Sequence, residues 1–382
     1  MIAVGLMSGT SLDGVDAALV AIRPDGSSYD VRLLDFATEP FEADLGKRLR
    51  AALPPNAGSA QQLAELHRAL GKAFGRAARS IAGAKRTDYV ASHGQTIFHD
   101  GSRGVTLQLG DPFAIRDAVR ATVCYDFRTA DCVAGGQGAP LVPYADALLF
   151  ASASEDRVAV NIGGIANITI LERGASPQTV IAFDTGPGNM LIDLFVRDRT
   201  GGAAGFDRDG SYALAGAVDV RALEALRADD YFALPPPKST GRERFGLEFL
   251  KRHAPVLDAL SLEDGAATLT ALTASTLGDA IQRFAPARAK ILVSGGGVRN
   301  RAILQGLRER LRGCSVEPSD AMNVDADAKE AIAFAILGYE TLRGRAANAS
   351  RATGAAAPVQ LGAIAPFELP ALLRKVEIEC RA

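Results

Sequence analysis

Two stretches of this 382-residue chain repeat one pattern: a short apolar run, a polar Gly-rich turn and a second apolar run. The first stretch covers residues 2–22 and turns at 7–16, and the second covers 157–171 and turns at Gly163-Gly164. Each is typical of a strand, a tight turn and a second strand. The second half of the chain therefore opens as the first half does, and the length fits two domains or one large α/β unit.

The first turn has the chemistry to hold a phosphate. Gly9 and Gly14 allow backbone N–H groups to converge on an anion. Thr10 and Ser11 add hydroxyl donors, and two aspartates in the same turn could hold a magnesium ion through water. Taken alone, these residues also fit an ordinary β-hairpin with a polar turn.

Composition and charge exclude several classes of function. The chain is 48% hydrophobic and 23% charged with a formal net charge of −2, so it lacks the basic surface that binds DNA, RNA or an anionic membrane. Its four cysteines are scattered without a CxxC pair, which excludes a disulfide scaffold or a zinc site and fits a reducing cytosol. No secretion signal or bilayer-spanning apolar run is recognisable. We expect a cytoplasmic protein that binds neither nucleic acid nor membrane.

Local patterns predict the elements around the turns. Ser59 is placed to cap one helix, and Asp111-Pro112 begins another in the favoured order of N-cap followed by Pro. Further helices are expected at residues 41–53, 298–311 and 328–342. Strands are expected at residues 89–92, 105–109, 121–127, 180–183 and 290–293.

Asp184 directly follows the predicted strand 180–183, and a helix is expected after Gly188. This order places Asp184 at the carboxyl end of a strand, the edge at which α/β sheets bind ligands. A third Gly-rich turn, Gly295-Gly296-Gly297, follows the predicted strand 290–293. Both positions are therefore candidates for a functional site.

Two further segments are expected to be loops. Residues 234–241 contain three prolines, which remove three backbone donors. This rigid segment is a connector, a wall of a substrate site or a subunit contact. Residues 345–358 are rich in Ala, Gly and Ser, and we expect them to form a solvent loop before the C-terminal segment.

Two strand-turn-strand hairpins followed by a third Gly-rich turn resemble the duplicated architecture of actin, sugar kinases and the Hsp70 ATPase. The resemblance implies an α/β, two-lobed, ribonuclease H-like fold with ATP and substrate in the cleft between the lobes. The hairpins would hold the phosphates, and the third turn would pack on adenosine. The first lobe is expected at residues 1–130 with a C-terminal return at about 346–382, and the second at 131–345.

Several sequence motifs of this chain resemble those of the anhydro-N-acetylmuramic acid kinases. They run through nearly the whole chain in the family's order, at residues 7–14, 92–96, 135–143, 161–167, 183–189 and 234–242. The resemblance implies an enzyme of peptidoglycan recycling that converts 1,6-anhydro-N-acetylmuramic acid, ATP and water into N-acetylmuramic acid 6-phosphate and ADP. Because O6 of this sugar is tied to C1, phosphorylation must accompany opening of the bridge.

The resemblance of the motif at residues 183–189 implies that Asp184 is the catalytic base, which would activate the water that attacks C1. Its alternative role is to cap the following helix. The residues implied in ATP binding are Gly9, Thr10, Ser11, Leu12, Asp13, Gly14, Val15, Asp16, Gly163, Gly164, Asn167, Gly295, Gly296 and Gly297. Of the two aspartates, Asp13 is the better candidate for a water-mediated contact with Mg²⁺.

Four residues are candidates for substrate binding. His93 and Gln95 follow a predicted strand and could bond sugar hydroxyls or the N-acetyl group, although a purely structural His93 is the alternative. Arg128 suits the lactyl carboxylate through a bidentate pair. Glu330 begins a long helix, where it either faces the cleft or interacts with the helix dipole.

Two alternative functions are considered. A related anhydrosugar kinase of the levoglucosan type would share the mechanism but lack recognition of the lactyl group. An ATP-gated binding module would use nucleotide to drive closure without phosphorylating a substrate, a reading that the presence of Asp184 weakens. The family resemblance favours a homodimer, and we expect closure of the lobes on ATP and sugar to exclude bulk water.

Overall fold

The computed structural model describes residues 1–9, 12, 14–25, 28–53 and 58–381. By their internal packing these residues form two compact units. Unit 1 consists of Met1–Leu149, Pro177–Thr179 and Ala328–Ala382, and unit 2 consists of Phe150–Ser176 and Val180–Asp327.

The borders of the units differ from the expected borders at residues 130 and 345. The cause is helix α13 (Lys329–Leu342), which is buried along almost its whole length and packs on strands of unit 1. A side chain added at Gly5 would meet the carbonyl oxygen of Ala331 at 1.8 Å, so the helix lies directly on the backbone of that sheet. The apolar pattern predicts the helix but does not say which sheet it covers.

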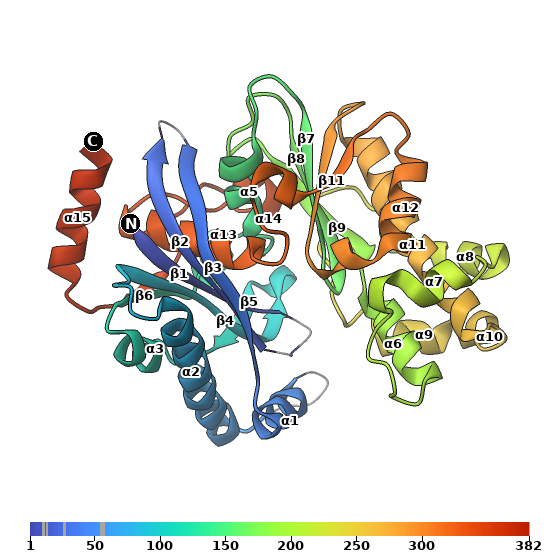
Figure 1. The fold of residues 1–382 in the computed structure, drawn as a ribbon, viewed down its shortest axis with the longest axis horizontal. Helices are drawn as coiled ribbons and strands as arrows, with labels where there is room; N and C mark the ends of the chain where they lie inside the picture. The colour runs from blue at the N-terminus through green and yellow to red at the C-terminus, as the bar shows by residue number, and fades with distance from the viewer. Residues whose placement is uncertain (10–11, 13, 26–27, 54–57, 382) are drawn as a thin grey trace. The chain divides into compact units, whose positions relative to one another are not determined.

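Unit 1 is built on one mixed sheet (Figure 1). Its strands are β1 (Ile2–Ser8), β2 (Gly14–Asp25), β3 (Ser28–Pro40), β4 (Tyr89–Asp100), β5 (Val105–Leu109), β6 (Thr122–Tyr125) and β12 (Ala363–Ala365). The order is β12-β6-β4-β1-β2-β3, with β5 paired to β4. Strand β1 is parallel to β4, β4 is parallel to β6, and β2 and β3 run antiparallel.

Helices cover both faces of this sheet. They are α1 (Ala43–Ala52), α2 (Ala60–Ala82), α3 (Pro112–Val119), α4 (Thr129–Val133), α5 (Val142–Phe150), α13, α14 (Ser350–Thr353) and α15 (Leu369–Arg381). Val4 and Leu6 of β1 belong to the core under α2, whereas the intervening Gly5 contacts α13. Because alternate residues of a strand face opposite sides, α2 and α13 lie on opposite faces.

Unit 2 repeats the arrangement. Its strands are β7 (Arg157–Ile162), β8 (Ile165–Leu171), β9 (Ile181–Pro187), β10 (Lys290–Ser294) and β11 (Val316–Pro318), and its helices are α6 (Met190–Arg199), α7 (Ser211–Ala215), α8 (Val220–Arg227), α9 (Leu247–Arg252), α10 (Ala254–Leu257), α11 (Leu262–Phe284) and α12 (Arg301–Arg310). The strand order is β11-β10-β7-β8-β9.

The two sheets share one topology. In each, the first strand pairs on one side with an antiparallel strand that is followed by a further antiparallel strand, and on the other side with two successive parallel strands. The sheet of unit 1 adds β5, antiparallel to β4, and β12, antiparallel to β6. This repeat is the duplicated ribonuclease H-like fold, so the fold class expected from the two hairpins is confirmed.

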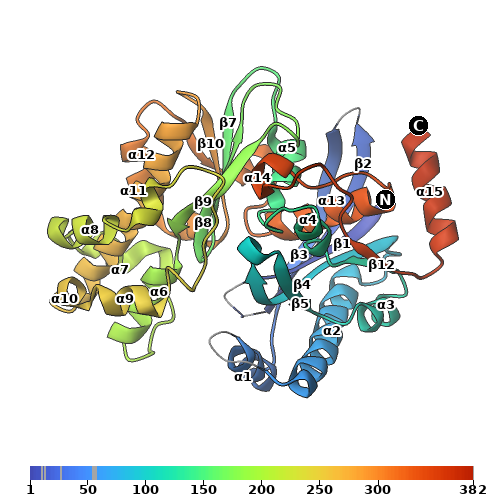
Figure 2. The ribbon, with the colours of Figure 1, turned by 180° about the vertical axis from the view of Figure 1, so that it is seen from behind.

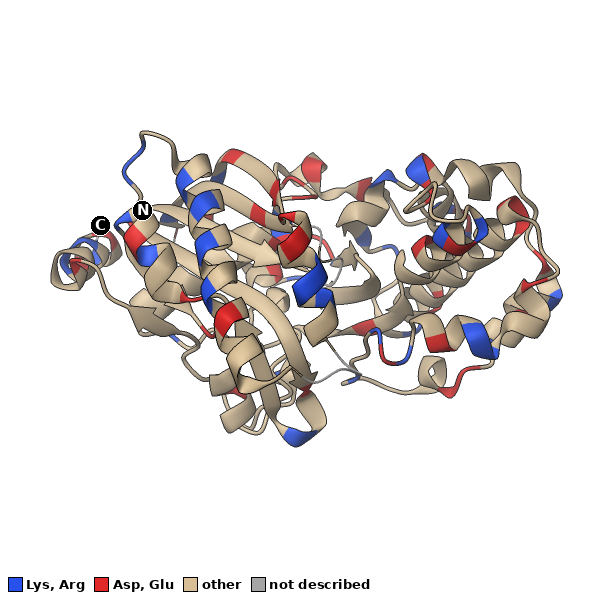
Figure 3. Cartoon of the chain, turned by 90° about the horizontal axis from the view of Figure 1, so that it is seen from below, with Lys and Arg blue, Asp and Glu red and all other residues tan. Residues whose placement is uncertain are grey.

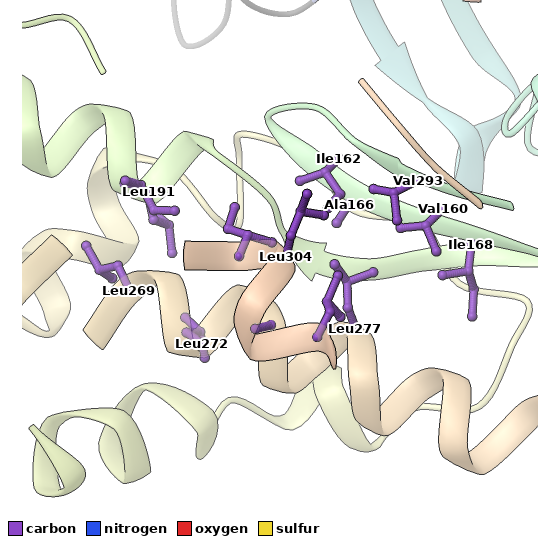
Figure 4. Packing of buried hydrophobic residues seen from close by; sticks show 14 of the residues in the cluster. Val160, Ile162, Ala166, Ile168, Leu191, Leu269, Leu272, Leu277, Val293 and Leu304 are labelled. Atoms are coloured by element: carbon purple, nitrogen blue, oxygen red, sulfur yellow. The ribbon is translucent and has the colours of Figure 1, made fainter. Parts of the chain in front are cut away.

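The core of unit 2 lies between its sheet and its long helices, as Figure 4 shows. Leu272 and Leu277 of α11 and Leu304 of α12 belong to the same cluster as Val160 of β7 and Ile168 of β8. Full burial of each large aliphatic side chain contributes about 1.5–3 kcal/mol, so this cluster fixes the sheet to its helices.

Both predicted helix starts are confirmed. The Ser59 side chain accepts from the amide of Gln62, whose side chain accepts from the Ser59 amide in return. Asp111 accepts from the amides of Phe113 and Ala114. These bonds satisfy amides that the helices themselves cannot pair.

The expectation of a solvent loop at residues 345–358 is wrong. Ala347, Asn348, Ala349 and Thr353 are each 0% exposed. The segment carries the short helix α14, and its polar side chains bond to buried groups of unit 1. Small side chains let this backbone pack closely, so the composition that is typical of a loop here serves burial.

The surface carries both signs of charge. Lys and Arg are interspersed with Asp and Glu in the view from below (Figure 3), in keeping with the formal net charge of −2. Among the helices that the structure describes, none combines the length and apolarity needed to cross a membrane.

Candidate functional site

The β1–β2 turn of unit 1 is fixed by a side chain of β4. The Ser8 hydroxyl lies 2.7 Å from the Gly14 carbonyl oxygen and 2.7 Å from Oε1 of Gln95. Nε2 of Gln95 donates to the Gly9 carbonyl at 3.3 Å, and the Gln95 side chain is only 2% exposed. Gln95 thus holds the β1 end of the turn, and Ser8 joins that end to Gly14, while contact of Gln95 with substrate remains a prediction. The predicted site residues Thr10, Ser11 and Asp13 lie outside the described residues.

The other residues of this turn have distinct surroundings. Leu12 and Val15 are buried at 4% and 1% exposure, so their side chains belong to the core of unit 1. A Cβ at Gly14 would lie 2.3 Å from the carbonyl oxygen of Glu39, which shows that close packing against β3 requires glycine here. Asp16 is half-buried on β2, and Oδ1 of its carboxylate accepts from Thr38 at 2.6 Å.

His93 is bonded within the protein through both ring nitrogens. Nε of Arg128 donates to Nε2 of His93 at 3.0 Å, and Nδ1 of His93 donates to the Gly94 carbonyl at 2.9 Å. Burial lowers the pKa of His93 well below its usual value, and the neighbouring Arg128 cation lowers it further. The ring, which packs on Phe334, is therefore neutral, and its Nε2 accepts a hydrogen bond that holds Arg128. Contact of His93 with substrate remains a prediction.

Arg128 is held on a second side as well. Its Nη1 donates to the Gly138 carbonyl at 2.6 Å. Two guanidinium nitrogens of Arg128 are thus fixed by His93 and by the Gly-rich segment 135–138, as recognition of a planar anion requires. This places two of the candidate substrate residues in direct contact.

Glu330 lies in the first turn of α13, close to other candidates. Burial raises the pKa of its carboxyl, Lys329 opposes that shift, and Asp16 adds to it. Lys329 itself is 1% exposed and donates to Oδ1 of Asp146 at 3.1 Å. The next residue, Ala331, lies directly against Gly5 of β1, so Glu330 lies beside the unit 1 sheet. Its contact with substrate remains a prediction.

In unit 2, the β7–β8 turn is anchored by the start of α6. The amide of Asn189 donates to the Gly163 carbonyl at 2.8 Å, and those of Gly188 and Met190 donate to the Gly164 carbonyl at 2.8 and 3.1 Å. Because C=O and N–H of a trans peptide point in opposite directions, the Gly164 amide points away from α6. The turn thereby presents a donor on its other side.

Asp184 lies within β9 rather than at the end of a strand. The ladder with β8 pairs Asn167 with Asp184 and continues to Gly186 and Pro187, so the expectation that the strand ends at residue 183 is wrong. An irregularity in the register falls between Ala166 and Asn167, next to this pair. Two predicted site residues, Asn167 and Asp184, are therefore cross-strand neighbours.

The Pro-rich segment 234–241 packs directly on Asp184. The Asp184 amide donates to the Lys238 carbonyl at 3.2 Å, and the Thr240 amide donates to Oδ2 of Asp184 at 2.9 Å. The Tyr231 hydroxyl donates to the Asp184 carbonyl at 2.8 Å. Both the backbone and the carboxylate of Asp184 are thus positioned by one loop.

Lys238 completes the surroundings of Asp184. Its Nζ donates to the Tyr231 carbonyl at 3.0 Å and lies 4.5 Å from the centre of the Tyr231 ring. Burial lowers the pKa of Lys238 to about 8, Arg283 lowers it further, and Asp184 opposes the shift. Neither Thr240 nor Lys238 is among the predicted site residues, although the polar run Lys-Ser-Thr directly follows the three prolines of this segment.

The third Gly-rich turn lies beside the end of β7. Gly295 has a φ of 80°, and a Cβ there would lie 2.6 Å from Oδ1 of Asn161. A Cβ at Gly297 would lie 2.3 Å from Cγ2 of Ile162, whereas one at Gly296 would meet no atom closer than 4.0 Å. Close packing therefore explains Gly295 and Gly297, and only Gly296 has open space for a ligand.

The described side chains offer little for direct metal binding. No group of three or more His, Cys, Asp or Glu residues that could hold an ion occurs in that part of the chain. Magnesium keeps several waters and bridges phosphates, so one carboxylate such as Asp16 suffices for a water-mediated contact. The residues present are compatible with that mode of binding.

Known proteins match this chain over nearly its whole length. A family model described as anhydro-N-acetylmuramic acid kinase matches residues 1–367. The chain is 40% identical over 379 residues to the anhydro-N-acetylmuramic acid kinase of Caldanaerobacter subterraneus subsp. tengcongensis, covering 94% of this chain and 96% of the relative. It is 43% identical over 371 residues to that of Xanthomonas axonopodis pv. citri, covering 95% and 97%.

Among solved structures, a ROK family glucokinase from Streptomyces griseus in complex with glucose and AMPPNP is similar over 88% of this chain and 99% of its own, with 12% identity and a TM-score of 0.40. The family match rests on the sequence comparisons, which span both units. The chain belongs to the anhydro-N-acetylmuramic acid kinase family.

Proposed function

We propose that this protein is an ATP-dependent kinase that opens the 1,6-anhydro bridge of 1,6-anhydro-N-acetylmuramic acid and phosphorylates O6, giving N-acetylmuramic acid 6-phosphate and ADP. Membership of the family supports the substrate and the place in peptidoglycan recycling. The observation that carries the chemistry is the Asp184 carboxylate, held on β9 by the Thr240 amide at 2.9 Å.

In the proposed reaction, Asp184 takes a proton from water while the water oxygen forms a bond to C1. The C1–O6 bond breaks, and O6 forms a bond to the γ-phosphorus as the bond to the leaving ADP oxygen breaks. Transfer of phosphate to O6 removes the need for a separate strong acid to protonate that oxygen. A general base of this kind contributes about 10²- to 10⁴-fold to the rate.

The phosphates of ATP are proposed to bind both Gly-rich turns. The Gly164 amide supplies a donor directed away from α6, and Gln95 holds Gly9 at the start of the other turn. Mg²⁺ would be held through water by Asp13 and Asp16 and would neutralise charge on the phosphates. Adenosine is proposed to pack on Gly296, where an added Cβ would meet no atom closer than 4.0 Å.

The sugar is proposed to bind Arg128 through its lactyl carboxylate. His93 and Gly138 hold the guanidinium for a bidentate contact. The partly buried Glu330 would accept a hydrogen bond from a sugar hydroxyl, while Gln95 shapes the turn beside them. Loss of the lactyl group should therefore raise the Michaelis constant, which separates this function from that of a levoglucosan-type kinase.

A reaction in oxygen-18 water tests the proposal. We expect each molecule of the phosphorylated product to carry one oxygen-18 atom at C1, measured by mass spectrometry. Label found only in released phosphate would instead reveal a plain ATPase, and the proposed function would fail. The matched reaction with levoglucosan, which lacks both the N-acetyl and lactyl groups, should proceed with a much higher Michaelis constant.

We further propose a homodimer that acts in the cytoplasm, where its cosubstrate ATP is available. Support comes from the family resemblance and from the use of ATP. Light scattering coupled to size-exclusion chromatography should give twice the mass of one 39.9 kDa chain. A monomer at micromolar concentration would contradict the proposed assembly.

A further inference from the structure

Asp131 is a fully buried carboxylate that lies outside the proposed catalytic chemistry. It belongs to α4 and is 0% exposed. Its Oδ1 accepts from Nδ2 of Asn348 at 2.7 Å and from the Thr353 hydroxyl at 2.8 Å, and its Oδ2 accepts from the Gly138 amide at 2.8 Å. Three donors satisfy the charge, as a carboxylate at this depth requires.

The donors come from two segments that are far apart in the chain. Figure 2 shows α14 close to α4 in the view from behind. Backbone bonds reinforce the contact: the Gln137 amide donates to the Thr353 carbonyl at 2.8 Å, and the Ala356 amide donates to the Ala134 carbonyl at 3.0 Å. The segment 345–358 is therefore hydrogen-bonded to the Gly-rich segment 134–138 through both side chains and backbone.

The Gly-rich segment is shaped to wrap around Asp131. A Cβ at Gly136 would lie 2.3 Å from Oδ2 of Asp131, and one at Gly138 would lie 2.6 Å from Sγ of Cys132. Gly138 also has a φ of 68°, a conformation that favours glycine. Any larger residue at these positions would push the segment away from the carboxylate.

Gly138 connects this buried cluster to Arg128. Its amide is held by Asp131, and its carbonyl accepts from Nη1 of Arg128 at 2.6 Å. The bond to Asp131 holds Gly138 at its amide, so it helps to fix the residue whose carbonyl, together with His93, holds the guanidinium. A bidentate contact with a carboxylate tolerates little rotation of that plane.

We propose that Asp131, Asn348 and Thr353 are positioning residues for substrate recognition, because they fix the Gly138 carbonyl that orients Arg128. The inference rests on the proposed function, in which Arg128 binds the lactyl carboxylate. The C-terminal segment thereby acts on the affinity for an acidic sugar without touching it.

Thr353→Val removes one donor to Asp131 and keeps the side-chain shape. We expect the Michaelis constant for 1,6-anhydro-N-acetylmuramic acid to rise roughly three- to tenfold, since one buried hydrogen bond to a charged group is lost. The Michaelis constant for ATP, and that for 1,6-anhydro-N-acetylglucosamine, which lacks the lactyl group, should stay unchanged. Thr353→Ser, which keeps the hydroxyl, should restore the parent value.

Thr341→Val is the matched control. Thr341 is a buried threonine of the same unit whose hydroxyl lies 2.9 Å from the carbonyls of Leu337 and Leu361. It should lower the melting temperature without changing the Michaelis constant for either sugar. If Thr353→Val behaves in the same way, losing stability only, the positioning role is overturned.

The variant Arg128→Ala tests the proposed contact with the lactyl carboxylate independently of the positioning role. If Arg128→Ala leaves the Michaelis constant for the acidic sugar unchanged, both the proposed carboxylate contact and the positioning role fail. If it raises that constant and Thr353→Val does not, only the positioning role fails. In the double variant we expect no rise beyond that of Arg128→Ala alone, and additive effects would contradict action through Arg128.

Discussion

The backbone amide of Thr240 donates a hydrogen bond of 2.9 Å to Oδ2 of Asp184. Because a proline has no amide hydrogen, Thr240→Pro should misplace the base and lower kcat roughly 10- to 100-fold. Thr240→Ala keeps the amide and should retain most of the activity. Steady-state kinetics and circular dichroism of both variants check this, and equal kcat values would show that the amide does not matter.

Asp184→Asn should still bind ATP, because the change lies at the proposed base and leaves the Gly-rich turns intact. An amide cannot accept the proton from water, so we expect kcat to fall roughly 10³-fold. Calorimetric titration with ATP and a turnover assay measure the two effects. Near-normal turnover would exclude Asp184 as the base.

Substitution by alanine at two glycines of the predicted ATP site should have different effects, one on stability and one on the Michaelis constant for ATP. Gly14→Ala places a methyl group 2.3 Å from the Glu39 carbonyl oxygen, so it should destabilise unit 1 by about 2 kcal/mol or more. Gly296→Ala meets nothing closer than 4.0 Å, so it should fold normally and raise only the Michaelis constant for ATP. Denaturant unfolding and kinetics distinguish them; a Gly296→Ala enzyme with unchanged ATP affinity would remove that contact from the proposal.

The buried pair of Lys329 and Asp146 predicts a stability effect. Lys329→Met removes the buried cation that lies 3.1 Å from Oδ1 of Asp146 and should cost about 3–5 kcal/mol. The double variant with Asp146→Leu should recover most of this loss. Lys375→Met, at the half-exposed pair with Asp88, is the control and should cost less than about 1 kcal/mol. Urea unfolding measures all three, and a small loss for Lys329→Met would contradict the prediction.

Asp193 predicts a dependence of stability on pH. Burial raises the pKa of this carboxyl in α6 to about 7, and Asp207 adds to the shift while Arg197 opposes it. A group whose folded pKa is raised contributes stability that is present below its unfolded pKa of about 3.9 and is lost as pH rises through 7. Asp193→Asn should therefore exceed the parent in stability at pH 8, by up to about 4 kcal/mol, with a smaller difference at pH 5.

The control for that measurement is Asp198→Asn, a change at an exposed aspartate of the same helix. It should shift the free energy of unfolding little and equally at both pH values. A gain for Asp193→Asn that is the same at pH 5 and pH 8 would show that its carboxyl does not titrate in this range.

The parts of the fold that depend on neighbouring residues could be predicted from the sequence. The hairpin patterns predict the two repeated sheets. The caps at Ser59 and Asp111 are also predictable, because their hydrogen bonds span three residues or fewer. The place of α13 could not be predicted, because its apolar pattern does not identify the sheet that it covers.

Contacts between distant segments explain why the other features of the structure could not be predicted from the sequence. The burial of Asn348 depends on Asp131, which lies 217 residues earlier, and composition alone favoured solvent. The Thr240 contact joins residues 56 positions apart. The continuation of β9 beyond Asp184 depends on pairing with β8, although Gly186 and Pro187 locally favour a break. The residues proposed for ATP and sugar binding came from the Gly-rich turns, from the family motifs and from side-chain chemistry, and they remain predictions.

The position of α13 has a consequence for how the molecule is made. During synthesis the strands from β1 to β6 leave the ribosome first, but the helix that lies on their backbone begins only at Lys329. Nearly all of unit 2 is complete by Asp327. We therefore expect the half that begins later in the chain to fold first, whereas the earlier half waits with one face of its sheet uncovered. A released chain that ends at residue 327 would contain all of the second unit and only part of the first.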